Sequence, residues 1–447
     1  MASVPLLGAS LGGLENSKDI AGSLSKDKRN SLRLGIIGFG NRGEELLRLL
    51  HLTNPDLADL NIEIRGICEV FKLRLELGLA AAGAHSKGYR NYIDLLDSDD
   101  IDAVIIATPD HWHARMALDA ADRGLHIYLE KCMTRSVDEA LALRDAVKRN
   151  QVVFQLGHQG RQRDLNLKAR ELMAKGILGK VTLIETTTNR NDPTEGWKTE
   201  LIEKASSDSI DWELFQGPAG EKHPFSTERY YGWRNYWAYG TGMSGDLLSE
   251  EFDTMNSILD LGIPESAVAT GGQYFHLDGR EVPDVFHAAY EYPHRALTLL
   301  YSGTLASGVS RGSLIMGHDA TLELGRILSV WADRKSTKYK SRIEAGIIDP
   351  SAPFVNYQKE HVDVDATSSA TSKYYADRGL ITTYREEKQL STTRLHLEEW
   401  LNCIRNGGET SCNIDRGFEE SVTAHMATIS YQEERKVRWD PDKENII

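Results

Sequence analysis

The chain has 447 residues, an apolar share of 40% and a formal net charge of −14 at pH 7. This length allows two or three domains with a large core. The acidic balance, carried without any basic block, argues against nucleic acid and anionic membrane surfaces as partners. No apolar run in the sequence reaches the length needed to span a bilayer.

Residues 1–30 form the first distinct segment. They are rich in small residues, only weakly apolar around 4–14, and carry no basic region at their start, so they do not match a signal peptide as they stand. We expect a disordered or loosely docked N-terminal arm and a cytoplasmic protein. An exported, periplasmic protein is the alternative if this segment is the remnant of a trimmed export signal.

The sequence contains four cysteines, Cys68, Cys132, Cys403 and Cys412. They show neither a CxxC pair nor zinc-ligand spacing, so we expect free buried thiols and no metal site. Cys403 and Cys412 are close enough in sequence to pair if the protein is exported.

The stretch 34–43 is the most informative in the chain. A short apolar run leads into Gly-x-Gly-x-x-Gly, and residues 44–50 then have helical character. In the dinucleotide-binding fingerprint Gly38 allows the tight turn, Gly40 lets the backbone approach a pyrophosphate, and Gly43 lets helix and strand pack closely. The free N–H groups of the helix face the anion. We therefore expect the loop to bind a dinucleotide through Gly38, Phe39, Gly40, Asn41, Arg42 and Gly43.

The predicted second strand, 60–69, ends in the carboxylate of Glu69. An acid at this position accepts hydrogen bonds from the adenosine ribose and repels a 2′-phosphate, which favours NAD over NADP. The alternative is a solvent-facing acid at a strand end. Lys72 and Arg74 follow closely, so NADP is retained as the less favoured cofactor.

Strand and helix patterns alternate through residue 156. Three apolar runs are separated by two helical patterns, at 101–109, 114–123, 125–131, 137–149 and 152–156. The nearly continuous apolar character of 101–109 is typical of a parallel strand covered on both faces. We therefore expect an α/β fold that begins with a doubly wound Rossmann domain over residues 31–156.

From residue 157 onward the pattern changes. Strand-like runs joined by turn-rich segments lie at 180–188, 266–271, 285–292, 296–304 and 320–324. They predict a C-terminal α+β domain over 157–447 with a large, mostly antiparallel open sheet. Helical patterns lie at 165–175, 395–405 and 417–431. We expect the polar stretch from about 333 to 390 to be a long surface excursion.

Three motifs together resemble those of the GFO/IDH/MocA oxidoreductases. They are Gly38–Gly43, Ala107–His113 and Glu130–Cys132, in this order. The resemblance covers residues 31 to 330 and fits the C-terminal helices. It implies a two-domain, NAD(P)-dependent enzyme that acts on a sugar, polyol or glycoside. The segments 189–193 and 439–441 are similar to those of longer, often exported members.

The resemblance implies roles for residues around the cofactor. Lys131 is the expected catalytic residue, either as a base or as a cation that polarises the alkoxide. The alternative is a surface lysine at a strand end. For His113 we expect helix packing and capping. Contacts to the cofactor are expected from Thr108, Pro109, His111, Glu130, Lys131 and Gln159.

Two departures from the family pattern bear on catalysis. The hallmark Glu-Lys-Pro is Glu-Lys-Cys here, so Cys132 replaces a residue that stiffens the backbone. Glu250 stands where a histidine usually follows Asp246 by four residues, and Asp253 lies beyond it. Asp246 and Glu250 share one helix face and can act as acid and base, bind substrate hydroxyls or ligate a metal. We place both among the catalytic residues.

The segment 229–242 is the most aromatic in the chain. Sugars present apolar C–H faces that stack on aromatic rings, and their hydroxyls need fixed polar partners. We expect substrate contacts from His158, Trp233, Arg234, Tyr236, Trp237, Asp246 and Asp253. The alternative is a core or oligomer-interface cluster, because aromatic residues and arginine are also enriched there.

These observations favour one function and leave two alternatives. The favoured one is an NAD-dependent oxidoreductase that transfers hydride between nicotinamide and a hydroxyl-bearing carbon of a sugar or glycoside. The first alternative is an NAD-dependent glycosidase that works by transient oxidation and elimination. The second is a non-catalytic sensor that binds NAD and a sugar. The resemblance also implies a homo-oligomer, a dimer or tetramer, formed through the open face of the second sheet.

Overall fold

A computed structural model of the chain describes residues 31–51, 60–191, 197, 205–309, 311–358, 382–385 and 388–447. The predicted N-terminal arm over 1–30 lies outside the described residues. Within them, no helix combines the length and apolarity that crossing a membrane requires.

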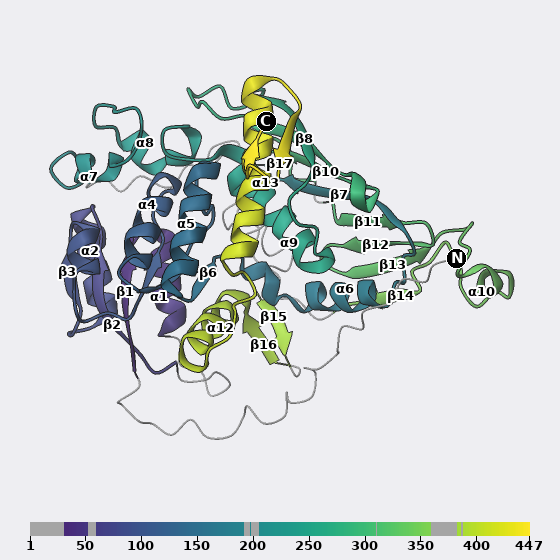
Figure 1. The fold of residues 1–447 in the computed structure, drawn as a ribbon, viewed down its shortest axis with the longest axis horizontal. Coiled ribbons are helices and arrows are strands. Elements are labelled where there is room, and N and C mark those ends of the chain that lie inside the picture. The colour runs from purple at the N-terminus through teal and green to yellow at the C-terminus, as the bar shows by residue number, and fades with distance from the viewer. Residues whose placement is uncertain are drawn as a thin grey trace.

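The first part of the chain is a six-stranded parallel sheet with the order β3-β2-β1-β4-β5-β6 (Figure 1). Its strands are β1 (Leu32–Ile37), β2 (Ile62–Cys68), β3 (Lys87–Tyr89), β4 (Ala103–Ile106), β5 (His126–Leu129) and β6 (Phe154–Leu156). The connecting helices are α1 (Asn41–Leu50), α2 (Lys72–Ala82), α3 (Tyr92–Leu96), α4 (Asp110–Ala121) and α5 (Val137–Asn150). The predicted doubly wound sheet is confirmed. Strand order reverses between β1 and β4, where such sheets bind ligands.

The second sheet has ten strands in the order β14-β13-β12-β11-β7-β10-β9-β8-β17-β18. The strands are β7 (Val181–Asn189), β8 (Ser266–Gly272), β9 (Val285–Tyr292), β10 (Leu297–Thr304), β11 (Ser313–Gly317), β12 (Ala320–Leu324), β13 (Leu328–Ala332), β14 (Val355–Tyr357), β17 (Val437–Asp440) and β18 (Asn445–Ile446). Among the described strands of this sheet, only β7 and β10 pair in parallel, so the prediction of a mostly antiparallel sheet is confirmed.

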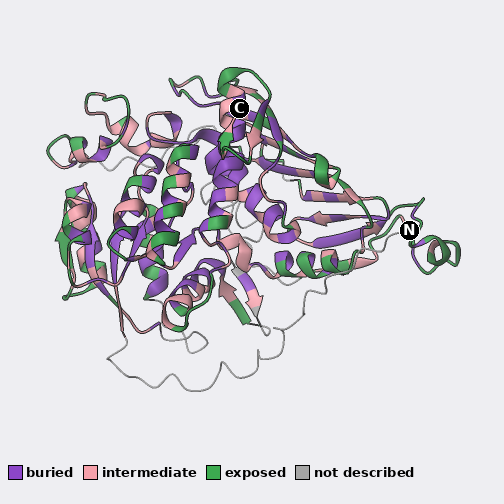
Figure 2. Cartoon of the chain, in the orientation of Figure 1, coloured by how far each residue is buried: buried purple, intermediate pink, exposed green. Residues whose placement is uncertain are grey.

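Helices that follow the six-stranded sheet in the sequence cover one face of the ten-stranded sheet, and α13 among them also contacts the six-stranded sheet. They are α6 (Asp164–Ala174), α9 (Ser249–Leu259), α12 (Thr392–Asn406) and α13 (Ile414–Glu433). Helix α13 runs between the two sheets and is buried along much of its length (Figure 2). Its buried side chains belong to a core cluster that is continuous from β4 and β5 to β9 and β10.

Helix α12 packs against α1, although the two helices lie near opposite ends of the sequence. Leu397, Trp400 and Leu401 are completely buried and complete the core of the parallel sheet. The Arg394 guanidinium donates to the carbonyl oxygens of Leu49 and Leu50, at 2.7 and 3.1 Å. The last quarter of the sequence therefore helps to hold the first helix that follows the glycine loop.

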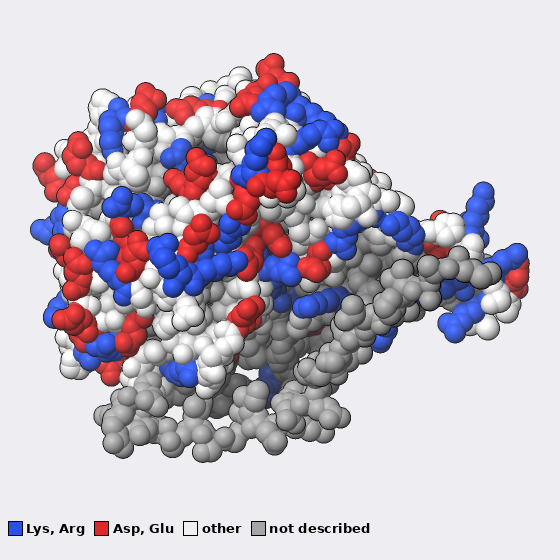
Figure 3. Space-filling model, viewed as in Figure 1, with Lys and Arg blue, Asp and Glu red and all other residues white. Residues whose placement is uncertain are grey.

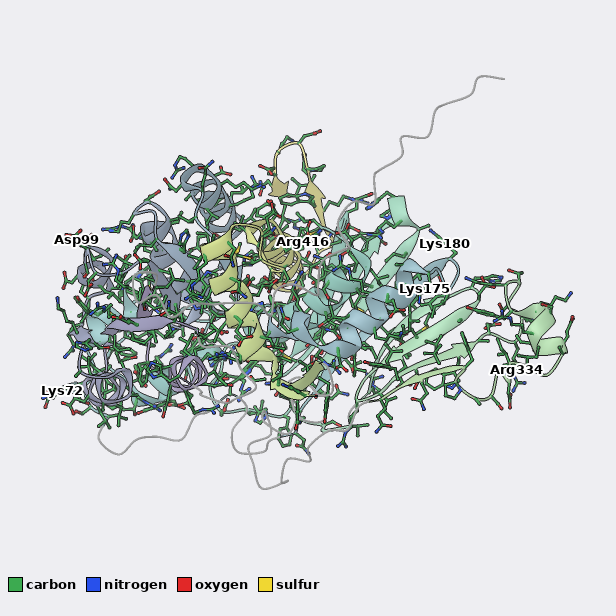
Figure 4. All side chains as sticks on the ribbon, turned by 90° about the horizontal axis from the view of Figure 1, so that it is seen from below. Lys72, Asp99, Lys175, Lys180, Arg334 and Arg416 are labelled. Atoms are coloured by element: carbon green, nitrogen blue, oxygen red, sulfur yellow. The ribbon has the colours of Figure 1, made fainter. Side chains whose placement is uncertain are left out.

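The stretch predicted as a surface excursion contains regular elements in its described part. Helix α10 (Lys340–Glu344) follows β13, β14 returns to pair with β13, and β15 (Thr382–Arg385) pairs with β16 (Lys388–Ser391). Figure 4 shows Arg334 at the end of the molecule opposite Lys72 and Asp99. Acidic and basic side chains alternate over the face seen in Figure 3. The remainder of the predicted excursion, residues 359–381 and 386–387, lies outside the described residues.

Candidate active site

The glycine loop joins β1 to α1 with the geometry that the fingerprint requires. Gly38 has a φ of +88°, and a Cβ there would lie 2.6 Å from the Ala107 carbonyl oxygen. A Cβ on Gly43 would lie 2.1 Å from the carbonyl oxygen of Gly38. A Cβ on Gly40 would meet no protein atom within 4 Å. Two glycines therefore allow the turn to close, and the third borders open space that a ligand can occupy.

The N-terminus of α1 is open to an anion. No side chain caps it. Arg74 of α2 donates to Asn41 Oδ1 and to Glu44 Oε2, both at 2.8 Å, so the Asn41 side chain is turned toward α2. The first-turn N–H groups of a helix have no intrahelical partner, and the helix dipole adds positive potential there. This end of α1 is suited to a pyrophosphate.

Glu69 ties the end of β2 to the glycine loop. Its two carboxylate oxygens accept the N–H groups of Phe39 at 2.7 Å and Phe71 at 2.9 Å. Burial raises the pKa of Glu69, and these N–H donors oppose the shift. Glu69 therefore has a structural task in the loop, and its contact with a ribose stays a prediction.

Three residues predicted to contact the cofactor bond to one another. The Arg42 guanidinium donates through Nε to Glu130 Oε1 at 2.7 Å and through Nη2 to Gln159 Oε1 at 3.2 Å. A Cβ on Gly157 would lie 2.9 Å from the Glu130 carboxylate, so only glycine leaves room for that carboxylate. These contacts join the first turn of α1 to the residues that follow β5 and β6.

Thr108 and Pro109 lie between β4 and α4, and Pro109 is the N-cap residue of that helix. His111, the next residue predicted to contact the cofactor, hydrogen-bonds to the short helix α7 (Trp212–Gln216). Its Nε2 lies 2.8 Å from the Phe215 carbonyl oxygen, and burial lowers its pKa to about 3. His113 lies between two carbonyl oxygens, with Nδ1 2.5 Å from that of Cys132 and Nε2 2.8 Å from that of Thr108. A cofactor contact of His111 stays a prediction.

Lys131, Asp246 and Glu250 form one buried cluster. Lys131 follows β5, while Asp246 lies in a π-helical turn, Ser244–Leu248, that continues into α9. Lys131 Nζ lies 2.8 Å from Asp246 Oδ1, 2.7 Å from the Asp246 carbonyl oxygen and 3.0 Å from Glu250 Oε1. The side chains of Lys131, Asp246 and Glu250 are 12%, 10% and 18% exposed. The structure therefore brings together all three residues predicted to be catalytic, and three acceptors face the three protons of an ammonium.

Positive charges keep both carboxylates ionised. Burial alone would raise the pKa of Asp246, but Lys131, Arg234 and Arg190 outweigh it and hold that pKa well below its ordinary value. Glu250 has a lowered pKa because Lys131 and Arg190 outweigh burial in the same way. Arg234 Nε lies 3.2 Å from Asp246 Oδ1. Two nearby carboxylates in turn stabilise Lys131 as an ammonium.

A cavity of about 540 Å³, its open mouth included, lies beside Glu250. Its walls come from the end of β6, with His158 and Gln159, and from α9, with Glu250 and Asp253. Arg161 binds Asp253 through Nη2 at 2.6 Å. The cavity therefore lies where the first sheet meets the second half of the chain, and Asp253 is already engaged by a protein cation.

The predicted aromatic substrate residues divide into two groups. The Arg234 guanidinium lies 4.1 Å from the ring centroid of Trp233, beside Asp246. Tyr236 is buried in a separate cluster with Phe215 and Tyr239, among others. Trp237 donates from its backbone N–H and its Nε1 to Glu281, at 2.9 and 3.1 Å. Arg234 joins the Lys131 cluster, whereas Trp233 packs both on Arg234 and against the aromatic cluster of Tyr236. The core-cluster alternative accounts for the position of Tyr236. Substrate contacts of all four residues stay predictions.

Sequence reasoning missed two buried charges near the cluster. Arg190, which follows β7, acts on both Asp246 and Glu250. Glu420 of α13 is 1% exposed and faces His158. The segment around Arg190 carried a family likeness in the sequence, but no local pattern marked Glu420.

The residues present fit a dinucleotide: Gly40 borders open space, the N-terminus of α1 is uncapped, and the acid Glu69 directly follows β2. Within the described ranges, no group of three or more histidine, cysteine, aspartate or glutamate side chains is arranged to hold a metal ion. All four cysteines are free thiols. Fold and site together define a dinucleotide-binding protein with a charged cavity between its two sheets.

Comparison with protein families assigns the chain within that class. The N-terminal family model, an oxidoreductase family with an NAD-binding Rossmann fold, matches residues 32–158. The C-terminal α/β domain model of the same family matches residues 219–438. The chain belongs to the GFO/IDH/MocA oxidoreductase family. Its predicted membership and its NAD-binding domain are thereby confirmed.

Sugar-related proteins are among its relatives. A glycosyl hydrolase family 109 protein of Shewanella woodyi is 30% identical over 178 residues, which cover 37% of this chain and 36% of that protein. Levoglucosan dehydrogenase of Pseudarthrobacter phenanthrenivorans is 27% identical over 205 residues, 43% of this chain and 46% of that one. The chain therefore matches less than half the length of each. A solved levoglucosan dehydrogenase in complex with NADH and L-sorbose shares the fold, with a TM-score of 0.65, 17% identity and coverage of 91% of this chain and 98% of that chain.

Proposed function

We propose that the protein is an NAD-dependent oxidoreductase that transfers hydride between nicotinamide and a hydroxyl-bearing carbon of a sugar or glycoside. The observation that carries this proposal is the buried contact of Lys131 with Asp246 and Glu250 beside the cavity. Relatives named levoglucosan dehydrogenase and glycosyl hydrolase support a carbohydrate as substrate.

Each group in the proposed site has a distinct task. The glycine loop and the N-terminus of α1 bind the pyrophosphate, and Glu69 binds the adenosine ribose. Bound NAD⁺ supplies the hydride acceptor. Lys131 exchanges one of its three acceptors for the reacting oxygen, donates a hydrogen bond to it and stabilises negative charge on it. Asp246 and Glu250 keep Lys131 charged and oriented.

A second candidate is an NAD-dependent glycosidase. It is favoured by the glycosyl hydrolase relative and by Glu250, an ionised carboxylate at the cavity. In this reaction a hydroxyl is oxidised transiently, the neighbouring C–H becomes acidic, and Glu250 removes that proton as the glycosidic bond breaks. Rehydration and reduction then regenerate NAD⁺.

One experiment separates these functions. The protein is incubated with NAD⁺ and a panel of free sugars and aryl glycosides, while reduced-nicotinamide absorbance and aglycone release are both recorded. Net cofactor reduction supports the oxidoreductase. Aglycone release without net reduction supports the glycosidase. If the protein binds NAD but gives neither signal, the result contradicts both enzymatic functions. The remaining alternative is then the non-catalytic sensor.

We propose further that the chain forms a homo-oligomer through the open face of the ten-stranded sheet. Val268, Ala289 and Leu300 are cross-strand neighbours on β8, β9 and β10. Val268 is 48% and Leu300 36% exposed, while Ala267 before Val268 and Leu299 and Tyr301 on either side of Leu300 are buried. Light scattering should give a dimer or tetramer for the wild type and a smaller species for Leu300→Glu. A monomeric wild type contradicts the proposal.

A further inference from the structure

His158 and Glu420 form a buried pair that has no part in the hydride-transfer reaction proposed for Lys131. His158 follows β6 and lines the cavity. Glu420 lies on α13, the helix between the two sheets. Nε2 of His158 lies 3.9 Å from Oε2 of Glu420, and the two side chains are 3% and 1% exposed. The pair therefore connects the cavity wall to a carboxylate that solvent does not reach.

Neither half of this contact has a substitute partner in the described part of the chain. Nε2 of His158 and both carboxylate oxygens of Glu420 are fully buried and make no hydrogen bond. Burying a carboxylate without a donor is strongly unfavourable. The His158 ring is the nearby group that can supply that donor when its proton is on Nε2. Nδ1, on the other side of the ring, is then left for the cavity.

Other charges around His158 come from three elements. Glu250 and Asp253 lie on α9, and Asp253 is bound by Arg161 of the short helix after β6. His396 of α12 has a pKa well below its ordinary value because of burial. Burial alone would lower the pKa of His158, but Asp253, Glu420 and Glu250 outweigh it and raise that pKa. His158 is thus a titratable group in a mainly acidic setting.

The Lys131 cluster lacks a proton acceptor suited to neutral pH. Lys131 points its protons at three oxygen acceptors, so its ammonium must lose one before it can act as a base. Glu250 stands at the position of the family's histidine, and its lowered pKa makes it a weak base. A general base works best when its pKa is near the working pH. Histidine is the side chain whose ordinary pKa lies nearest neutral pH, and His158 lines the cavity.

We propose that His158 exchanges the proton of the reacting hydroxyl, with Glu420 holding its ring. This rests on the proposed function. In oxidation the substrate O–H bond breaks, its proton goes to Nδ1 of His158, and the electron pair left on oxygen forms the carbonyl as the hydride leaves the carbon for nicotinamide. Glu420 accepts the Nε2–H throughout and stabilises the imidazolium. In reduction the same proton returns to the oxygen. His158 is the catalytic residue, and Glu420 is a positioning residue.

The first test is the pH dependence of kcat/KM for sugar oxidation. The wild type should rise with pH through one ionisation. His158→Gln should lose this ionisation and about 100-fold or more in kcat. Glu420→Gln should keep it but shift it to lower pH, because the charge that favours the imidazolium is gone. The matched control is Glu419→Gln, the same change one position earlier on α13 at a residue paired with Arg416, which should follow the wild-type profile.

A second measurement does not depend on turnover. Nitrogen-15 NMR of the histidine rings in the full chain should show His158 with its proton on Nε2 and a pKa that falls in Glu420→Gln. An unchanged His158 titration in that variant overturns the pair even if His158→Gln does not fold. Wild-type hydride transfer that His158→Gln retains overturns only the role of His158. No hydride transfer by the wild type with any sugar overturns the proposed function itself.

Discussion

The glycine loop and the Lys131 cluster lie along one edge of the same sheet, but they are built differently. The loop depends on backbone: a Cβ at Gly38 or Gly43 would overlap a carbonyl oxygen. The cluster depends on charge, with Lys131 after β5 facing Asp246 of the π-helical turn and Glu250 of α9. The first is specified by residues close in sequence, and the second forms only when distant segments meet. Substitutions should therefore act sterically in one and electrostatically in the other.

The largest effect is expected from Lys131→Ala. We expect kcat to fall by about 100- to 10,000-fold, because the cation that stabilises the reacting oxygen is lost. NAD binding, measured by fluorescence titration, should change little, since the glycine loop is untouched. Lys148→Ala, which removes a surface partner of Asp415, is the control. Full activity in Lys131→Ala would refute the role of Lys131.

Two substitutions in the glycine loop can distinguish its role in folding from its role in binding the cofactor. Gly43→Ala should lower both the melting temperature and NAD affinity, since its Cβ would lie 2.1 Å from the Gly38 carbonyl oxygen. Gly40→Ala should leave the melting temperature unchanged, because its Cβ meets no protein atom, yet weaken NAD binding about 10-fold or more. Wild-type NAD affinity in Gly40→Ala would mean that the cofactor does not approach this residue.

The Lys131 cluster should make the free energy of unfolding depend on pH in the acidic range. Asp246 and Glu250 have lowered pKa values in the folded protein, so they stabilise it above their ordinary values of 3.8 and 4.5. That stability is lost as the pH falls below those values through the folded ones. Urea unfolding between pH 6 and pH 3 should show a smaller loss in Glu250→Gln than in the wild type. Equal losses would indicate that Glu250 has no lowered pKa.

The smallest effect is expected in the aromatic segment. Trp233→Ala should raise KM a few-fold, because the ring that packs on Arg234 beside Asp246 is lost. Trp237→Ala should alter KM less, since that side chain donates to Glu281 instead. Steady-state kinetics on one sugar compares the two. The reverse order would move the substrate toward Trp237.

The sequence predicted those parts of the molecule whose signals are local. The glycine spacing, the apolar run at β4 and the alternation of strand and helix each arise within a few residues, and each is confirmed by the fold. The strands β11 and β13, which lie on either side of β12 in the sheet, were not predicted, although β12 of the same length was. The packing of α12 on α1 has no local signal at all.

The candidate site was predictable only to the same extent. The family resemblance identified Lys131, Asp246 and Glu250 as candidate residues. It did not predict the π-helical turn that places the Asp246 carbonyl oxygen next to Lys131. Nor could pattern alone place Glu420 opposite His158, since β6 and α13 meet only in the folded chain. Burial and charge at these residues are properties of the tertiary structure.

Transfer of deuterium from sugar to cofactor tests the central claim most directly. The protein is incubated with NAD⁺ and sugars deuterated at their hydroxyl-bearing carbons, and the nicotinamide is examined by mass spectrometry. We predict that the wild type places deuterium on the nicotinamide and that Lys131→Ala does not. Absence of label with every sugar, in a protein that binds NAD, would contradict the account.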